Sequence, residues 1–152
     1  MRSTLPVMML GLSILPLPAA AATVVNCNPT KVKAVVASSE RFTTSTVLVN
    51  LPEARAAIVQ GGSRPSCVIV QFEAQVATNG TLVIGVTIDG DGSGVIPAPR
   101  QFVFDTSAYQ TTGGTFIIPS VAPGVHRIRV QYAGNGNAVN VKNTNTIIHY
   151  AP

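Results

Sequence analysis

Residues 89–94, with the sequence DGDGSG, place oxygen-bearing side chains at alternate positions. Asp89, Asp91 and Ser93 stand at the first, third and fifth places and a glycine at the sixth, as in the opening of a helix-flanked calcium loop. The twelfth place, which needs a bidentate glutamate, is Arg100, and the flanking residues are strand-like. A helix-loop-helix site is therefore not expected. Two interpretations stay open: a calcium site on a β-loop at Asp89, Asp91 and Ser93, and a plain Asp-Gly turn.

The inventory for catalysis is small. The chain has two histidines, His126 and His149, with three aspartates and three glutamates. A hydrolytic triad needs a base, a nucleophile and an orienting group, and no Gly-x-Ser-x-Gly elbow supports one. His126 also belongs to an apolar alternating row, which favours a structural role. The sequence predicts no enzyme and no catalytic residue.

Cys27 and Cys67 are the only cysteines. Since no ligand spacing surrounds them, a metal or catalytic role is the weaker interpretation, and the pair predicts one disulfide in an oxidising compartment. Such a bridge closes a loop of about 40 residues and contributes about 3 to 4 kcal/mol on chain-entropy grounds.

Residues 1–22 have the pattern of an export signal. Arg2 provides the positive start, residues 10–17 lie in an apolar stretch, and residues 19–22 are small, as at a cleavage site. The stretch is interrupted by prolines and is too short to cross a bilayer, so no membrane span is expected. The prediction is a secreted, periplasmic or cell-surface protein whose residues 23–152 form a single domain.

The charge pattern argues against a nucleic-acid partner. The whole chain has ten Lys or Arg against six Asp or Glu, and without Arg2 the formal net charge is +3. The basic residues are scattered along the sequence and never form a run, so no nucleic-acid partner is predicted.

The elements that position these residues are strands, because the apolar residues recur with period two. Every second residue of 68–76 and of 82–88 is apolar, and Asn79-Gly80 between them favours a tight hairpin turn. His126 opens a third apolar row that continues to Tyr132, with Arg127, Arg129 and Gln131 opposite. Further strands are expected at 32–36, 46–51, 54–59, 102–104, 115–118, 139–142 and 146–150. Turns are expected at 61–62, 89–94, 111–114, 123–124 and 134–137. The fold class predicted is all-β, an antiparallel β-sandwich or jelly roll.

Three stretches in order carry a resemblance: VQFEA at 70–74, VTIDG at 86–90 running through a proline-containing loop to Phe102, and VAPGVHRIRVQ at 121–131. Together they resemble secreted or virion-associated bacterial jelly-roll domains of the C1q and tumour-necrosis-factor type. The resemblance implies a non-catalytic, often oligomeric surface or structural module, and it carries over no catalytic residue.

The leading hypothesis is an exported structural or interaction module that presents a rigid sheet surface to a protein partner or to a second copy. A pilus or fimbrial-type adhesin subunit is the alternative, suggested by the Cys27 and Cys67 spacing and by Tyr150 near the C-terminus. Only four residues separate the expected cleavage point from Cys27, which leaves no room there for a donor strand. A calcium-dependent ligand module is a third hypothesis. Carbohydrate stays open as a ligand, although the chain has no Trp and Tyr109 is its one obvious exposed aromatic residue.

Overall fold

The computed structural model describes residues 27–105 and 107–152, and the predicted export signal lies outside them. The described residues form strands joined by loops and contain no helix that could cross a membrane. The strands are β1 (Lys31–Ala37), β2 (Arg41–Thr43), β3 (Val49–Gln60), β4 (Ser66–Thr78), β5 (Thr81–Ile88), β6 (Arg100–Val103), β7 (Gln110–Val121), β8 (Gly124–Ala133) and β9 (Val139–Tyr150).

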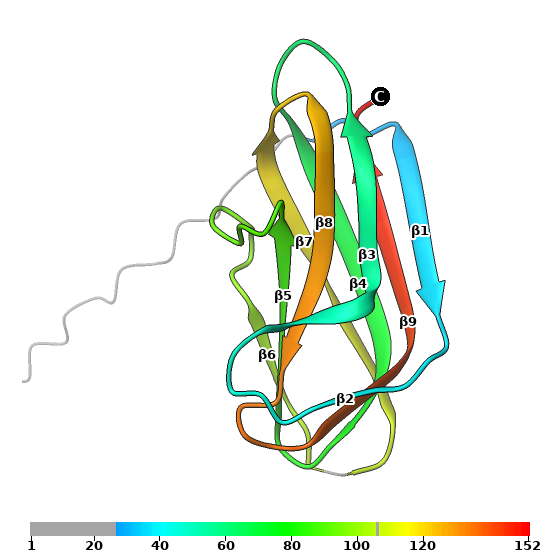
Figure 1. Ribbon diagram of the computed structural model, residues 1–152, viewed down its shortest axis with the longest axis vertical. Helices are drawn as coiled ribbons and strands as arrows, with labels where there is room; N and C mark the ends of the chain where they lie inside the picture. The colour runs from blue at the N-terminus through cyan, green and yellow to red at the C-terminus, as the bar shows by residue number, and fades with distance from the viewer. Residues whose placement is uncertain (1–26, 106) are drawn as a thin grey trace, which may run out of the picture.

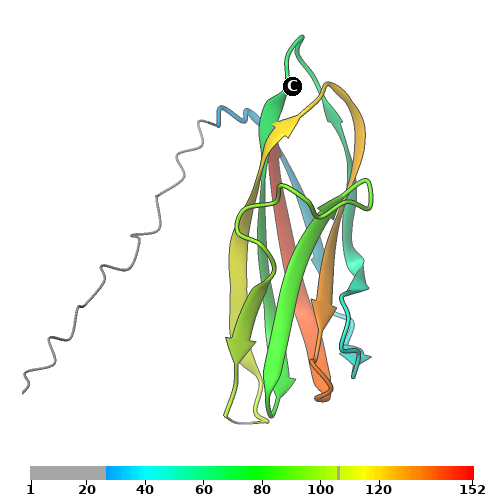
Figure 2. The ribbon, with the colours of Figure 1, turned by 90° about the vertical axis from the view of Figure 1, so that its left-hand side faces the viewer.

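Two antiparallel sheets pack face to face (Figures 1 and 2). Sheet A has the order β1-β9-β4-β7, with the short β2 also paired to β9, and sheet B has the order β3-β8-β5-β6. In Figure 1 sheet B lies in front and sheet A behind, and Figure 2 shows the two layers edge-on. The predicted all-β antiparallel sandwich is confirmed.

The pairing follows one simple rule. With β2 set aside, the first strand pairs with the last, and the pairs then move inward along the chain as β3 with β8, β4 with β7, and β5 with β6. This is a long hairpin of eight strands rolled into two sheets, which is the jelly-roll arrangement. Each pair of the roll is complete within the described residues, and no gap remains there for the donor strand of a pilus subunit.

The core is made by the alternating rows that the sequence predicts. Val68, Val70 and Phe72 of β4 face Leu82 and Ile84 of β5 across the interior, and all are buried. Each fully buried side chain of this size contributes about 1.5 to 3 kcal/mol through loss of contact with water. The rows therefore fix which face of each strand points outward.

The Asn79-Gly80 turn is tight, but the prediction of a hairpin there is wrong. Gly80 has a φ of 155°, and Asn79 is not among the residues with positive φ, so the backbone is not that of a two-residue Asn-Gly hairpin turn. The strands on either side also lie in opposite sheets, with β4 in sheet A and β5 in sheet B. Both edges of β4 are already occupied by β9 and β7, so β5 crosses to the other layer instead of pairing with its neighbour in sequence.

Several predicted boundaries also change. The predicted strands at 46–51 and 54–59 are largely one strand, β3, with a register shift against β8 between Asn50 and Arg55. The predicted strands at 139–142 and 146–150 are one strand, β9, which bulges at Asn143 with a φ of 50°. The predicted turn at 111–114 lies inside β7 and is wrong. In each case pairing with a long neighbour strand overrides the local turn residues.

The predicted disulfide is confirmed. Cys27 and Cys67 are bonded, with their Cα atoms 5.4 Å apart. Cys27 precedes β1 and Cys67 lies near the start of β4, so the bond ties the first described residues to an inner strand of sheet A.

Candidate functional site

The predicted calcium loop follows β5 directly, and its first carboxylate turns toward β8. Asp89 has a positive φ of 52°, in the left-handed region. Its Oδ2 lies 2.7 Å from His126 Nδ1, and its Oδ1 accepts a hydrogen bond from the backbone N–H of Arg127 at 2.8 Å. These contacts, the backbone bond first, lower the pKa of Asp89 below its ordinary value.

The second carboxylate serves the loop itself. Asp91 accepts the backbone N–H of Ser93 at 2.8 Å and its hydroxyl at 2.7 Å, and these bonds lower the pKa of Asp91. Asp89 and Asp91 are thus engaged by separate partners. Within residues 27–105 and 107–152, no group of three or more His, Cys, Asp or Glu side chains gathers as a metal site. Calcium binding at Asp89, Asp91 and Ser93 stays a prediction.

The two contacts of the His126 ring favour its charged form. Its Nδ1 faces the Asp89 carboxylate, and its Nε2 lies 2.8 Å from the carbonyl oxygen of Ala122. Both neighbours accept hydrogen bonds, so both ring nitrogens must carry a proton for the two bonds to form. The bond to Asp89 is the main cause that raises the pKa of His126 above its ordinary 6.5.

We expect this pair to make stability depend on pH. Because the folded pKa of His126 is raised, its contribution is complete below 6.5 and is lost as pH rises through the folded value. Asp89 has a lowered pKa, so its contribution is present above 3.8 and is lost as pH falls through the folded value. Urea unfolding from pH 5 to 9 should show the free energy of unfolding decline at the alkaline end by about 0.5 to 1 kcal/mol.

The His126→Gln variant should remove that decline, whereas Asp91→Asn, which changes a carboxylate of the same loop that does not touch His126, should keep it. An equal decline in wild type and His126→Gln would show that the pair does not act on stability.

The outer face of sheet A forms a larger candidate site. Directly opposed residues of antiparallel strands share a face, so the pairing register sorts the outward side chains into rows across β1, β9, β4 and β7. The rows are Val32–His149–Ile69–Ile117, then Ala34–Ile147–Gln71–Thr115, then Val36–Asn145–Glu73–Gly113, and finally Lys142–Gln75–Thr111 without a β1 member. Of these fifteen positions one is acidic and one is a lysine.

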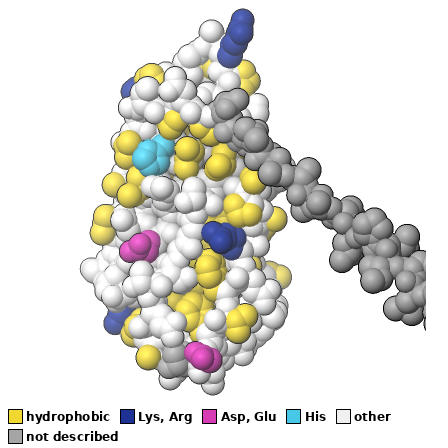
Figure 3. Space-filling view, turned by 180° about the vertical axis from the view of Figure 1, so that it is seen from behind, with side chains coloured by type: hydrophobic (Ala, Val, Ile, Leu, Met, Phe, Trp, Pro, Cys, Tyr) yellow, Lys and Arg dark blue, Asp and Glu magenta, His cyan; other side chains and the backbone are white. Residues whose placement is uncertain are grey.

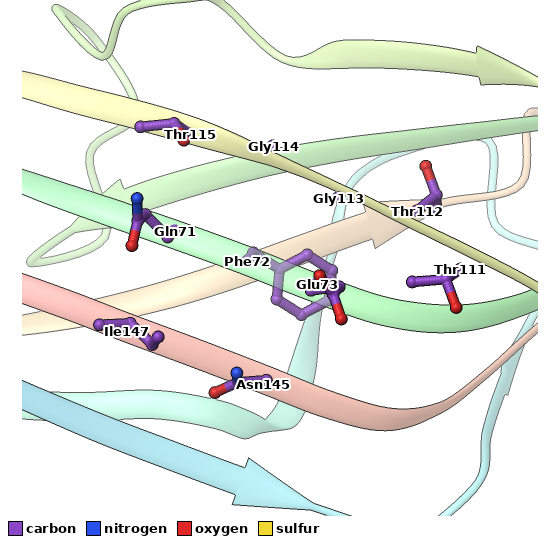
Figure 4. Close-up of a pocket in the computed structure, with 10 residues that line it drawn as sticks. All are labelled: Gln71, Phe72, Glu73, Thr111, Thr112, Gly113, Gly114, Thr115, Asn145 and Ile147. Atoms are coloured by element: carbon purple, nitrogen blue, oxygen red, sulfur yellow. The ribbon is translucent and has the colours of Figure 1, made fainter.

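A shallow groove crosses the middle of this face. It has a volume of about 460 Å³ and lies over β7, β4 and β9 (Figure 4). Figure 4 shows Thr115 and Thr111 on either side of Gly113 and Gly114, which leave a stretch of β7 without side chains. The amides of Gln71 and Asn145 face the open side of the groove, so hydrogen-bonding groups and the apolar Ile147 are presented together.

One end of the face is closed by a small cluster. The Tyr109 hydroxyl donates a hydrogen bond to Glu40 at 2.6 Å, and Lys142 Nζ lies 3.6 Å from the centre of the Tyr109 ring. The acceptor carboxylate raises the pKa of Tyr109. Because Lys142 occupies one face of the ring, Tyr109 offers only its other face for stacking on a sugar. The prediction that Tyr109 is the one obvious exposed aromatic residue is wrong, since Phe42 is 60% exposed and Tyr109 38%.

Figure 3 shows the outer face of sheet A from behind: apolar and uncharged polar side chains cover most of it, and the charged ones stand apart. Alternation in the sequence identifies Gln71 and Glu73 as outward-facing. It does not place Asn145 or Thr115 beside them, because those neighbours come from strands far away in the chain.

No family model matches the chain. No curated protein matches it either. The resemblance to C1q and tumour-necrosis-factor domains therefore gains no support beyond the shared sandwich architecture.

Solved structures of similar fold are distant in sequence. A family 35 carbohydrate-binding module from Clostridium thermocellum is 12% identical with a TM-score of 0.39, over 75% of this chain and 97% of that one. A protein of the disulfide-linked pili that form Bacillus endospore appendages is 14% identical with a TM-score of 0.36, over 86% and 100%. Latent PorU from Porphyromonas gingivalis is 8% identical with a TM-score of 0.40, and the match spans 84% of this chain but only 14% of PorU. These likenesses concern the fold alone.

Proposed function

We propose that the chain is an exported, non-catalytic structural module that associates with a second copy of itself through the outer face of sheet A. One observation carries the proposal: four strands present a broad, open face whose fifteen register positions include only Glu73 and Lys142 as fully charged residues. Depletion of charge is the compositional mark of the centre of a protein interface.

The apolar side chains of the face are grouped toward one end. Ile69, Ile117 and Ile147 are half-buried on three adjacent strands, and Val32 and Val36 on β1 are 60% and 75% exposed. Burying these side chains against a partner would stabilise the complex by about 25 cal/mol per Å² of apolar area removed from water. A solvated outer face of an antiparallel sheet is ordinarily polar, so this apolar area supports a buried use.

The choice of a second copy as the partner rests on charge. Glu73 and Lys142 lie in adjacent rows on neighbouring strands, one negative and one positive. In a two-fold packing the same patch meets itself, so the carboxylate of each copy can face the lysine of the other. The face is in this sense complementary to itself, whereas a strongly basic or acidic partner would leave one of the two charges opposed.

Export is supported by the Cys27–Cys67 bond, since structural disulfides persist in oxidising compartments. The predicted signal at residues 1–22 agrees with this.

Sedimentation velocity of the processed protein should show a reversible dimer at concentrations up to about 100 µM. Ile147→Lys places a charge in the centre of the face and should shift the protein to monomer. The control is Val125→Lys, which introduces the same charge at an apolar residue, 70% exposed, on the outer face of sheet B. Equal melting temperatures would show that both variants fold.

Exchanging the charges of Glu73 and Lys142 tests whether the two copies pack so that these residues face each other. Glu73→Lys alone should weaken the dimer, because two like charges then meet, and Glu73→Lys with Lys142→Glu should restore it. A strict monomer at every concentration, or equal loss in Ile147→Lys and Val125→Lys, would overturn the proposal. Open-ended polymers in place of dimers would overturn the two-fold packing.

A further inference from the structure

Three arginines gather on the outer face of sheet B, on the opposite side of the molecule from the proposed dimer surface. Arg55 of β3 lies directly opposite Arg129 of β8, and Arg127 lies opposite Ala57 in the same pair of strands. Because opposed residues share a face, all three guanidinium groups project from one side. Arg55 and Arg127 are exposed, and Arg129 is half-buried.

Arg55 and Arg129 have no anionic partner within the described part of the chain, and Arg127 has only the nearby Asp89 carboxylate. The ion pairs found there, Arg41 with Glu53 and His126 with Asp89, include none of the three arginines. Asp89 is the carboxylate bound to the backbone of Arg127, and both its oxygens already accept hydrogen bonds, from His126 and from that backbone N–H. The three side chains therefore keep their donors open to solvent.

Like charges directly opposed across a sheet are unfavourable, so the Arg55–Arg129 pair lowers stability unless an anion lies between the two groups. A position that violates a local rule with no compensating contact in the fold is where function is expected. The scarcity of charge elsewhere strengthens this, because charged residues make up only 11% of the chain.

The arginines surround a hollow that could hold an anionic group. Its volume is about 360 Å³, and besides the three arginines it is lined by Ala56, Ala57 and Ile128. The small Ala57 opposite Arg127 leaves the space open. Next along the same strands, Val59 and Val125 are opposed and exposed, so an apolar surface adjoins the charged one.

We propose that this hollow binds the carboxylate or sulfate groups of an anionic polysaccharide. The arginine fork matches planar oxyanions with two parallel hydrogen bonds. An open sheet face suits a polymer that runs across it, and the Val59–Val125 pair can contact the C–H surface of the sugar rings. The disulfide supports export, so the ligand is taken to be a polyanion found outside the cell.

Binding of the processed protein to alginate, which carries carboxylates, and to dextran sulfate is measured by calorimetry at low and high salt, with neutral dextran as the reference. Wild type should bind both acidic polymers, more weakly at high salt, and should not bind dextran. Arg55→Gln with Arg129→Gln should weaken binding by about tenfold or more. Its melting temperature should equal or exceed that of wild type, because a repulsion is removed.

The matched control is Lys31→Gln with Arg64→Gln, which lowers the net charge equally at two exposed residues outside the hollow. It should bind almost as wild type does. Arg55→Lys with Arg129→Lys keeps the charge but removes the paired N–H donors of the guanidinium groups. This variant should bind less well than wild type. Equal weakening by the two Gln pairs would mean that net charge alone acts, and this would overturn the site. Tighter binding to DNA or to anionic vesicles than to either acidic polysaccharide would overturn the ligand class.

Discussion

Replacing both cysteines, as Cys27→Ala with Cys67→Ala, should lower the free energy of unfolding by about 3 to 4 kcal/mol. The bond joins residues 40 apart in sequence, so in the unfolded chain it removes the freedom of a long loop. In the folded protein it ties the segment before β1 to β4, across the intervening β9. Urea unfolding of the two proteins measures the effect, and the melting temperature should fall by about 10 °C.

The m-value of the urea curve tests whether the bond acts by restricting the unfolded chain. An unfolded chain freed from its cross-link exposes more surface, so the m-value should rise in the double variant. Wild type treated with reductant should unfold at the same urea concentration as the double variant. An unchanged midpoint in both would show that the bond does not stabilise the roll.

Gly113→Ala is expected to cost about 3 kcal/mol, because the new methyl group has no room. A Cβ built on Gly113 would stand 2.1 Å from the carbonyl oxygen of Phe72, which belongs to the backbone of β4 and cannot turn aside. The edge strand β7 would have to separate from β4, and the floor of the groove would change with it. Thermal and urea unfolding of the purified variant measure the loss.

The neighbouring glycine provides the control. A Cβ on Gly114 would meet the Arg100 side chain at 3.1 Å, and that flexible chain can move. Gly114→Ala should therefore change stability by less than about 1 kcal/mol. If Gly113→Ala and Gly114→Ala behave alike, the close approach of β7 to β4 does not limit the sheet.

The fold class could be predicted from the sequence because period-two alternation is a local property, visible in residues 68–76 and 82–88 without knowledge of the neighbours. Strand order could not, since it depends on contacts between distant segments. The Asn79-Gly80 turn illustrates this: the dipeptide predicts a hairpin, but the partners of β4 are β7 and β9 and the chain crosses to the other sheet. The glycines at 113 and 114 have the composition of a turn, yet at Gly113 the absent side chain allows two strands to approach.

For the candidate sites, too, the sequence predicts the local residues but not the neighbours that come from distant strands. The residues of the 89–94 loop are contiguous and were recognised directly, but whether Asp89 faces a metal or His126 depends on the position of β8. The arginine cluster combines one residue of β3 with two of β8, which lie more than 70 positions later in the sequence. Arg127 and Arg129 were identified as outward-facing, but their approach to Arg55 follows only from the register of the two strands.

The strand order of the jelly roll determines when its sheets can form. The first strand of the described chain lies against the last one, and β4 also needs β9 as a neighbour. During synthesis, sheet A therefore cannot be completed until β9 has been made. Because its closure joins segments that are far apart in the chain, we expect folding on the millisecond-to-second timescale of folds built from distant pairings.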